Sequence, residues 1–393
     1  MRVWVQRFSA ISFGLIISLV LLEFLIRVAF SLMPYSVQVI LRDVHRHPFT
    51  DELLLPEPIW HSAEAYQLIA RPNVDDELHY PDPRVGFHIS TKNWLDPGSH
   101  VGFRVPDVSW EPQWPVDAVA VGDSFTFCYT EYEDCWVRRL ETEHNLSMVN
   151  LGLVATGSLS RRNVLNTFGL LYEPRFVIWQ WYGNDFNDDY GMIQPITAES
   201  TTATPTNPLQ TWLDQNSAVY HLSATLFVRF ASETDLQPYT RFENQYYSFE
   251  DGVEIGFGQS YILEAFDLTL AKNQKGQAET EAVLLSVNER LAAEQIPWVI
   301  LLIPSKEEVY AKWTEPQLGA AQLAKLAQGR QEMLSFCAVH GLACLDSTAV
   351  LQKAAEQSEP IYYEEDTHLA PRGNEILTAA IWEFLLQEQL VQE

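Results

Sequence analysis

The stretch Val116–Ser124 reads VDAVAVGDS, and it decides how the rest of the chain is interpreted. Its apolar part, residues 116–121, is short and rich in valine, which is typical of a strand buried on both faces of a parallel sheet. Gly, Asp and Ser follow at once. Because parallel sheets place their reactive and ligand-binding groups at the carboxyl ends of the strands, we expect Ser124 at the functional edge of the sheet.

Four more apolar runs of this kind follow, at residues 147–151, 176–181, 298–303 and 342–345. Helical patterns lie between and after them, near residues 134–144, 159–172, 278–294 and 318–340 and after Pro371. Strands that alternate with helices predict a mostly parallel sheet with helices on both faces. The predicted fold class is therefore α/β, a three-layer α/β/α sandwich with about five parallel strands.

Three further polar blocks fall near the ends of these elements. Gly152 follows the second strand, and Gly157 comes shortly after it. The third strand ends in Gly183-Asn184-Asp185, and Asp366-Thr367-His368 stands just before the last helix. All three blocks are therefore expected at the same edge of the sheet as Ser124.

Together with Gly122-Asp123-Ser124, these blocks resemble in kind and in order the four blocks of the SGNH (GDSL-type) hydrolases. The resemblance covers roughly residues 116–388. It implies the flavodoxin-like SGNH fold and an enzyme that acts on ester-linked acyl groups.

The resemblance also implies a role for each block. Ser124 would be the nucleophile, and His368 the base that takes its proton and later donates it to the leaving group. The amides of Ser124 and Gly157 and the side chain of Asn184 would form the oxyanion hole, with Gly152 competing with Gly157 for that place. Such a mechanism needs no metal and no organic cofactor.

The acid of the triad is where the chain departs from the usual pattern. Most of the family places Asp three residues before the His, and that position is Glu365 here. Asp366 stands two residues before His368, a spacing that resembles the branch of the alginate-type O-acetyltransferases and related membrane-associated proteins. We favour Asp366 as the orienting carboxylate, with Glu365 as the alternative acid.

The N-terminus is apolar. Residues 8–22 carry no charge, and the apolar character continues to Met33. A helix over residues 11–33 would be about 35 Å long, enough to span a bilayer. We predict a membrane anchor there, with residues 1–10 as a cytoplasmic tail and the catalytic body in the periplasm or outside the cell. A cleavable signal peptide, with residues 10–22 as its apolar part, is the alternative.

The charge is unevenly distributed. The 393 residues include 25 Lys+Arg and 52 Asp+Glu, a formal charge of −27, whereas the first 33 residues carry a net +2. Within the apolar segment, Glu23 and Arg27 are spaced to pair on one helix face. So acidic a body argues against nucleic acid as a partner and against peripheral docking on anionic lipid.

Two regions have no clear place in the pattern. Residues 34–115, before the SGNH-like domain of residues 116–393, are rich in Pro, Trp and His and predict no definite architecture. Residues 191–275 interrupt the domain between its third and fourth strands, and they begin with a Thr/Ser/Pro-rich run at 197–206. We interpret them as an insertion that forms a lid or cap, or else a peripheral elaboration.

The four cysteines form two pairs with the same spacing. Cys337 and Cys344 flank a turn and can form a disulfide in an oxidising compartment. Cys128 and Cys135 could not bridge if both lay on one helix, two turns apart. The disulfide state is therefore open at this point.

The sequence shows no metal-binding motif. The His residues lack metal-ligand spacing, and there is no C-x-x-C pair. The acidic run at residues 185–189 starts like a calcium loop but has Tyr190 where the turn glycine should be. We interpret it as a solvated acidic loop beside the site.

These features predict a membrane-anchored, extracytoplasmic serine esterase of the SGNH type. Its substrate would be an ester, above all an O-acylated cell-surface or secreted glycan, from which it removes or transfers an acyl group through acyl-Ser124. A transferase would also need a membrane partner that supplies the acyl donor. The alternatives are a lipase- or thioesterase-like hydrolase of lipid or small esters, and a catalytically silent module that binds polysaccharide or scaffolds an envelope assembly.

Overall fold

A computed structural model describes most of the chain. The described residues are 2–33, 37, 41, 60–63, 67–78, 86–96, 98–193, 209, 212–213, 216–220, 222–224, 238–239, 241–242, 245–249, 252, 254–357 and 360–392. The chain divides into two units. One comprises Met1–Pro58 and Ile196–Asp235, and the other, which holds the predicted site, comprises Ile59–Pro195 and Leu236–Glu393.

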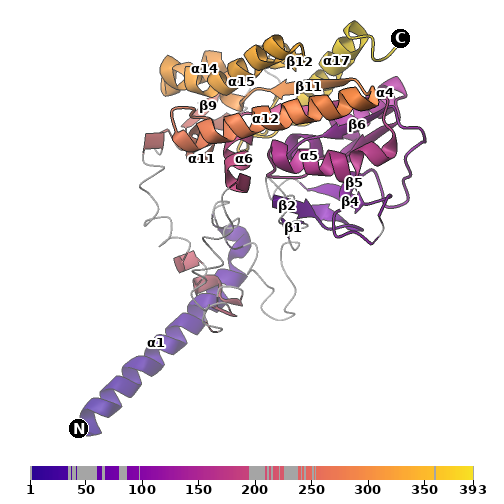
Figure 1. Ribbon diagram of the computed structural model, residues 1–393. Coiled ribbons are helices and arrows are strands. Elements are labelled where there is room, and N and C mark those ends of the chain that lie inside the picture. Colours follow the sequence, from indigo (N-terminus) through magenta and orange to yellow (C-terminus); the bar gives the residue numbers. More distant parts are fainter. Residues whose placement is uncertain are drawn as a thin grey trace. The chain divides into compact units, whose positions relative to one another are not determined.

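The centre of the larger unit is a sheet of five parallel strands (Figure 1). The strands are β6 (Ala118–Val121), β7 (Met148–Asn150), β8 (Phe176–Tyr182), β11 (Trp298–Ile303) and β12 (Ala343–Asp346). Their spatial order is β7-β6-β8-β11-β12. In chain order this is 2-1-3-4-5, the order of flavodoxin-like doubly wound sheets. The predicted parallel sheet is confirmed, strand by strand.

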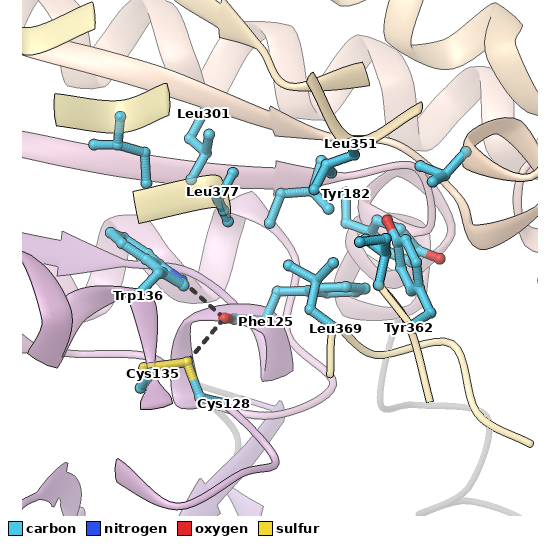
Figure 2. Packing of buried hydrophobic residues seen from close by; sticks show 14 of the residues in the cluster. Phe125, Cys128, Cys135, Trp136, Tyr182, Leu301, Leu351, Tyr362, Leu369 and Leu377 are labelled. Atoms are coloured by element: carbon cyan, nitrogen blue, oxygen red, sulfur yellow. Dashed lines mark hydrogen bonds between the residues drawn. A yellow bond between two sulfur atoms is a disulfide. The ribbon is translucent and has the colours of Figure 1, made fainter. Parts of the chain in front are cut away.

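Helices cover both faces of this sheet, because successive side chains of each strand point to opposite sides. On one face, residues such as Ala120 and Leu301 pack against α4 (Trp136–His144), α16 (Thr348–Ala355) and α17 (Pro371–Gln387). Figure 2 shows part of this core, where Trp136, Leu301 and Leu377 converge. On the other face, Trp179 and Leu302 pack against α5 (Ser158–Thr167), α12 (Ala271–Glu294) and α15 (Ala320–His340). The three-layer architecture is therefore confirmed.

The last helix shows how local sequence and packing agree. α17 begins at Pro371, as predicted, because proline fits the first helical turn, where its missing N–H costs nothing. Leu377, Ile381 and Leu385 recur at helical spacing and are almost wholly buried. Burial of such a side chain contributes about 1.5–3 kcal/mol. This face holds α17 against the sheet. In the chain, α17 directly follows the segment that carries His368.

Residues 34–115 include regular structure that the sequence did not predict. The strands are β1 (Trp60–Ala63), β2 (Gln67–Ala70), β3 (Asp75–Leu78), β4 (Phe87–Lys92) and β5 (Phe103–Val105). They form two antiparallel sheets, β1-β2 and β3-β4-β5. Ile69, Val101 and Phe103 are buried in the same hydrophobic cluster as Val119 of the central sheet. This part of the extension is therefore integral to the larger unit.

The insertion is divided between the two units. Residues 196–235 belong to the smaller unit, while the remainder packs with the central sheet. Near the site, α6 (Asp185–Ile193) leads into the insertion, and the insertion contributes the hairpin of β9 (Gln245–Ser248) and β10 (Glu254–Phe257). The Thr/Ser/Pro-rich run lies outside the described residues.

The smaller unit contains α1 (Arg2–Val28) and η1 (Phe30–Leu32), so a helix forms where the anchor was predicted but begins earlier. No helix in the part of the chain that the structure describes is both long and apolar enough to cross a membrane. Glu23 and Arg27 form the expected ion pair, and both also contact the insertion. The Glu23 carboxylate accepts the backbone N–H groups of Ala218 and Val219, at 2.9 and 3.0 Å.

Candidate active site

Ser124 lies in a tightly held turn at the carboxyl end of β6, where the four-residue helix α3 (Ser124–Phe127) begins. The Asp123 carboxylate accepts the backbone N–H of Phe125 at 2.8 Å, and its own N–H donates to Gln180 Oε1 at 2.9 Å. Gly122 is required here, because a Cβ would lie only 2.3 Å from that same Gln180 oxygen. These contacts fix the backbone that presents the Ser124 side chain.

The structure brings Ser124, His368 and Asp366 together. Ser124 Oγ lies 2.7 Å from His368 Nε2. On the other side of the ring, Nδ1 is hydrogen-bonded directly to Asp366 Oδ1, which also accepts the His368 backbone N–H at 2.8 Å. A ring that donates from Nδ1 to a carboxylate leaves Nε2 free to take the hydroxyl proton, so this chain of contacts can activate Ser124.

The two candidate acids have different surroundings. Burial acts to raise the pKa of Asp366, but the His368 ring, the His368 N–H donors and Lys306 more than offset it, so the pKa lies below the usual 3.8. The exposed Glu365 carboxylate instead accepts the hydroxyl of Tyr246, at 3.1 Å. The structure therefore brings Asp366, and not Glu365, into contact with His368.

The His368 ring is also enclosed by aromatic side chains. Its centroid lies 5.0 Å from that of Phe125 and 4.6 Å from that of Tyr129, which meets it edge-on. Tyr129 was not predicted as a site residue. Its closeness to Ser124 in sequence is the one signal that could have indicated it.

The predicted oxyanion-hole residues lie where the chain leads from a strand into the next helix. Asn184 stands between β8 and α6, and its Nδ2 donates to Asp188 Oδ2 at 3.0 Å. Gly157 directly precedes α5. The competing glycine, Gly152, donates its N–H to Asn150 Oδ1 at 2.9 Å, so that amide is already used within the fold.

The acidic run at residues 185–189 is not a solvated loop, so that interpretation is wrong. It forms the start of α6, and Asp185 and Asp189 are fully buried. The physical reason is Arg161 of α5, also buried, whose guanidinium binds both oxygens of Asp185 and lies 3.3 Å from Asp123 Oδ2. A buried arginine therefore ties the third block to the nucleophile turn.

Asp189 should make stability depend on pH. Burial raises its pKa from the usual 3.8 to about 6, although hydrogen bonds from Thr280 Oγ1 and the Leu159 N–H offset part of the effect. Between these two values the folded state keeps a proton that the unfolded state releases. The contribution of Asp189 to the free energy of unfolding therefore falls as pH rises through this window and is constant above it.

Urea unfolding of the wild type and of Asp189→Asn at pH 4 and pH 7 measures this contribution. When the pH is raised from 4 to 7, the free energy of unfolding should decrease more in the wild type than in Asp189→Asn. Equal losses would contradict the assignment to Asp189.

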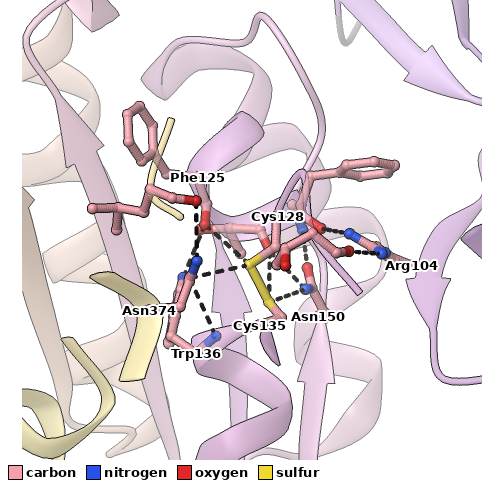
Figure 3. Close-up of a disulfide and its surroundings, with 12 residues drawn as sticks. Arg104, Phe125, Cys128, Cys135, Trp136, Asn150 and Asn374 are labelled. Atoms are coloured by element: carbon pink, nitrogen blue, oxygen red, sulfur yellow. Dashed lines mark hydrogen bonds between the residues drawn. A yellow bond between two sulfur atoms is a disulfide. The ribbon is translucent and has the colours of Figure 1, made fainter. Parts of the chain in front are cut away.

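Cys128 and Cys135 form a disulfide (Figure 3). The sequence excluded such a bridge only for the case in which both residues lie on one helix. They do not share a helix. Cys128 ends α3 with a φ of 63°, and Cys135 directly precedes α4, so their Cα atoms are only 5.6 Å apart. Cys337 and Cys344, at the end of α15 and in β12, are also bridged.

Side chains from three distant elements hold the backbone around this disulfide (Figure 3). So short a helix as α3 leaves its carbonyls without helical partners. The carbonyl of Phe125 accepts Trp136 Nε1 at 3.0 Å, that of Thr126 accepts Asn150 Nδ2 at 2.6 Å, and that of Phe127 accepts Arg104 Nη1 at 3.0 Å. Since Arg104 lies on β5, the N-terminal extension helps to build the nucleophile turn.

The two disulfides offer a matched comparison, because each closes a loop of the same length. Removing either pair by Cys→Ser substitution should lower the free energy of unfolding by about 2–3 kcal/mol. Only the Cys128/Cys135 variant should also lose ester-hydrolysing activity, by about tenfold or more, because it loosens the nucleophile turn. Denaturant unfolding and steady-state kinetics measure the two effects, and equal activities of the two variants would contradict this role.

In the part of the chain that the structure describes, no three His, Cys, Asp or Glu side chains are grouped so as to hold a metal ion. The hydrogen bonds at Ser124 join a hydroxyl, an imidazole and a carboxylate. These are the groups that nucleophilic acyl chemistry uses.

Comparison with known proteins gives one family and several solved structures. Residues 263–393, which include Asp366 and His368, match the model of the SGNH hydrolase-like domain, acetyltransferase AlgX. Over these residues, the match confirms the predicted resemblance to the alginate O-acetyltransferase-like branch. No curated protein matches the sequence.

Two of the similar solved structures come from bacterial proteins. One is assigned to the lipolytic G-D-S-L family of Desulfitobacterium hafniense, with 14% identity, 68% of this chain and 98% of the other covered, and a TM-score of 0.37. The other is a catalytic mutant of an acetylxylan esterase from Geobacillus stearothermophilus, with 11% identity, coverage of 69% and 94%, and a TM-score of 0.38.

Proposed function

We propose that this SGNH-type ester hydrolase or O-acyltransferase removes or transfers an acyl group, above all acetyl, on a cell-surface or secreted glycan. The observation that carries the proposal is the chain of contacts from Ser124 Oγ through His368 to Asp366. The match of residues 263–393 to a family described as an acetyltransferase supports acetyl as the group.

In the proposed mechanism, Ser124 Oγ attacks the ester carbonyl carbon while His368 Nε2 takes the hydroxyl proton. Asp366 stabilises the resulting imidazolium. The amides of Ser124 and Gly157 and the Asn184 side chain stabilise the oxyanion. The C–O bond of the ester then breaks, His368 protonates the departing alcohol, and the acyl group stays on Ser124.

The second half-reaction decides between hydrolase and transferase. Water or a glycan hydroxyl gives its proton to His368 and attacks the acyl carbon, which frees Ser124 and yields a carboxylic acid or a new ester. A transferase of this design needs a partner at the membrane that supplies the acyl donor. The charge of −27 favours a glycan that is not strongly anionic.

Mass analysis of the Ser124 peptide tests the proposal. The full chain in detergent is incubated with an activated acetyl ester, quenched in acid and digested. We expect a mass increase of one acetyl group on this peptide, and faster loss of that group when an acceptor glycan is added if the enzyme is a transferase. A marked preference for long-chain esters would favour the lipase-like alternative, and the absence of any adduct would favour the silent module.

We further propose that the apolar N-terminal segment, residues 11–33, anchors the chain in a membrane, with the larger unit outside the cytoplasm. The uncharged run of residues 8–22 supports an anchor. The two disulfides support an oxidising compartment. We expect the protein to stay in the membrane fraction after alkaline carbonate extraction. We also expect protease to digest it when the protease is added to cells whose outer layers have been permeabilised but whose cytoplasmic membrane is intact. Release by carbonate, or protection from protease, would contradict this location.

A further inference from the structure

Lys306 occupies a fixed place beside the candidate site. It is the first residue of α13 (Lys306–Val309), shortly after β11 ends. A capping box holds this start: the Ser305 hydroxyl accepts the Glu308 N–H at 3.2 Å, and Glu308 Oε2 accepts the Ser305 N–H at 3.0 Å. Lys306 is only 1% exposed. The capping box therefore fixes the backbone at Lys306, and its side chain is buried within the protein.

The Lys306 ammonium binds a single loop. Its Nζ lies 2.6 Å from the carbonyl oxygen of Tyr363, 2.7 Å from that of Glu364 and 3.2 Å from that of Asp366. An ammonium has three N–H donors, so these three acceptors use all of them. The loop that they belong to carries Asp366 and leads directly to His368.

We propose that Lys306 is a positioning residue that holds the loop 363–366, and through it the Asp366–His368 pair, in place against Ser124. This inference rests on the proposed function. Lys306 does not touch the reacting atoms. It acts by donating hydrogen bonds to three of the four carbonyl oxygens of a segment that has no helix or strand of its own.

The hairpin of the insertion supports the same loop. The Gly256 N–H of β10 donates to the Glu364 carbonyl at 2.7 Å, and Gln259 Nε2 donates to the Glu365 carbonyl at 3.0 Å. All four loop carbonyls therefore have donors outside the loop. Lys306 provides most of these contacts, and it alone reaches the carbonyl of Asp366 among the described residues.

A packing role alone does not explain a lysine here. A buried ammonium loses its hydration, and a methionine of similar length would fill the same space without that loss. The charged groups that face Lys306 are Glu307 on its own helix and Glu364, Glu365 and Asp366 on the loop. A positive charge at this place also helps to keep the Asp366 carboxylate ionised beside His368.

The test compares Lys306→Met and Lys306→Gln with the wild type in the full chain, using an activated acetyl ester. We expect kcat to fall about 100-fold in Lys306→Met, because small displacements of catalytic groups have effects of this size. KM should change less than about threefold, because Lys306 does not contact substrate. Lys306→Gln keeps two N–H donors and should retain more activity than Lys306→Met.

Lys325→Met is the matched control. Lys325 is another lysine whose Nζ donates a short hydrogen bond, in this case to the Asp267 carboxylate at 2.5 Å, and no contact between it and the loop 363–366 is seen. Its kcat should equal that of the wild type. Proton NMR gives a readout independent of turnover: the far-downfield signal of the His368–Asp366 hydrogen bond should persist in Lys325→Met and be lost or shifted in Lys306→Met.

The outcomes separate this inference from the proposed function. A wild type without acyl-enzyme or turnover would overturn the proposed function. An active wild type with an equally active Lys306→Met, or a Lys306→Met whose defect lies in KM alone, would overturn the role of Lys306 and leave the function intact. If Lys306→Met does not fold, Lys306→Gln decides, and an unchanged kcat and NMR signal in that variant would likewise overturn it.

Discussion

Ser124→Ala should lose at least about 10³-fold in kcat/KM toward an activated ester. The substitution removes the only atom that can carry the acyl group in the proposed mechanism, while the surrounding hydrogen bonds of Asp123 and Gln180 stay in place. The loss should therefore lie in chemistry and not in folding. Steady-state kinetics together with thermal unfolding measure both, and a fluorophosphonate probe should label the wild type but not the variant.

Ser347→Ala is a suitable control. Ser347 also follows a parallel strand, β12, but its hydroxyl donates to the Leu302 carbonyl, at 2.8 Å. Losing this buried hydrogen bond should cost about 1 kcal/mol of stability and leave kcat/KM unchanged. Equal activity of Ser124→Ala and the wild type would reject Ser124 as the nucleophile.

Asp366→Asn should reduce kcat/KM by about 10⁴-fold. The carboxylate selects the ring form of His368 that carries its proton on Nδ1, and an amide can turn its NH₂ group toward that nitrogen and favour the wrong form. The side chain of Glu365 instead binds Tyr246. Glu365→Gln should therefore change kcat/KM less than about threefold.

The same kinetic assay at neutral pH decides between the two acids. A larger loss in Glu365→Gln than in Asp366→Asn would reverse the choice. The Tyr246→Phe variant removes the hydroxyl that Glu365 accepts, so it shows whether any effect of Glu365 depends on that contact.

The five central strands could be predicted because each is buried on both faces, which produces a continuous apolar run in the local sequence. The strands of the extension could not. β3 reads Asp-Asp-Glu-Leu, and only its last residue is buried, so nothing in its composition indicates a strand. It becomes one by pairing with β4, and pairing partners are a property of the folded chain.

The polar residues of the site also divide into those that could be predicted from the sequence and those that could not. The order of the blocks indicated Ser124, Asn184 and His368. The burial of Asp185 depends on Arg161, which is 24 residues away in sequence and comes from another helix. Likewise, the spacing of Cys128 and Cys135 could not reveal that α3 stops after one turn and lets the chain fold back. Lys306 lay inside a region with no motif, and only the path of the loop 363–366 shows what it binds.

The distance along the chain between Ser124 and His368 has a consequence for biosynthesis. The two residues are separated by 244 positions, and His368 follows the last strand of the sheet. During translation the nucleophile is therefore made 244 residues before its base, because a chain is synthesised from the N-terminus onward. A nascent chain therefore carries the Ser124 hydroxyl without its base until the segment that holds His368 has been made.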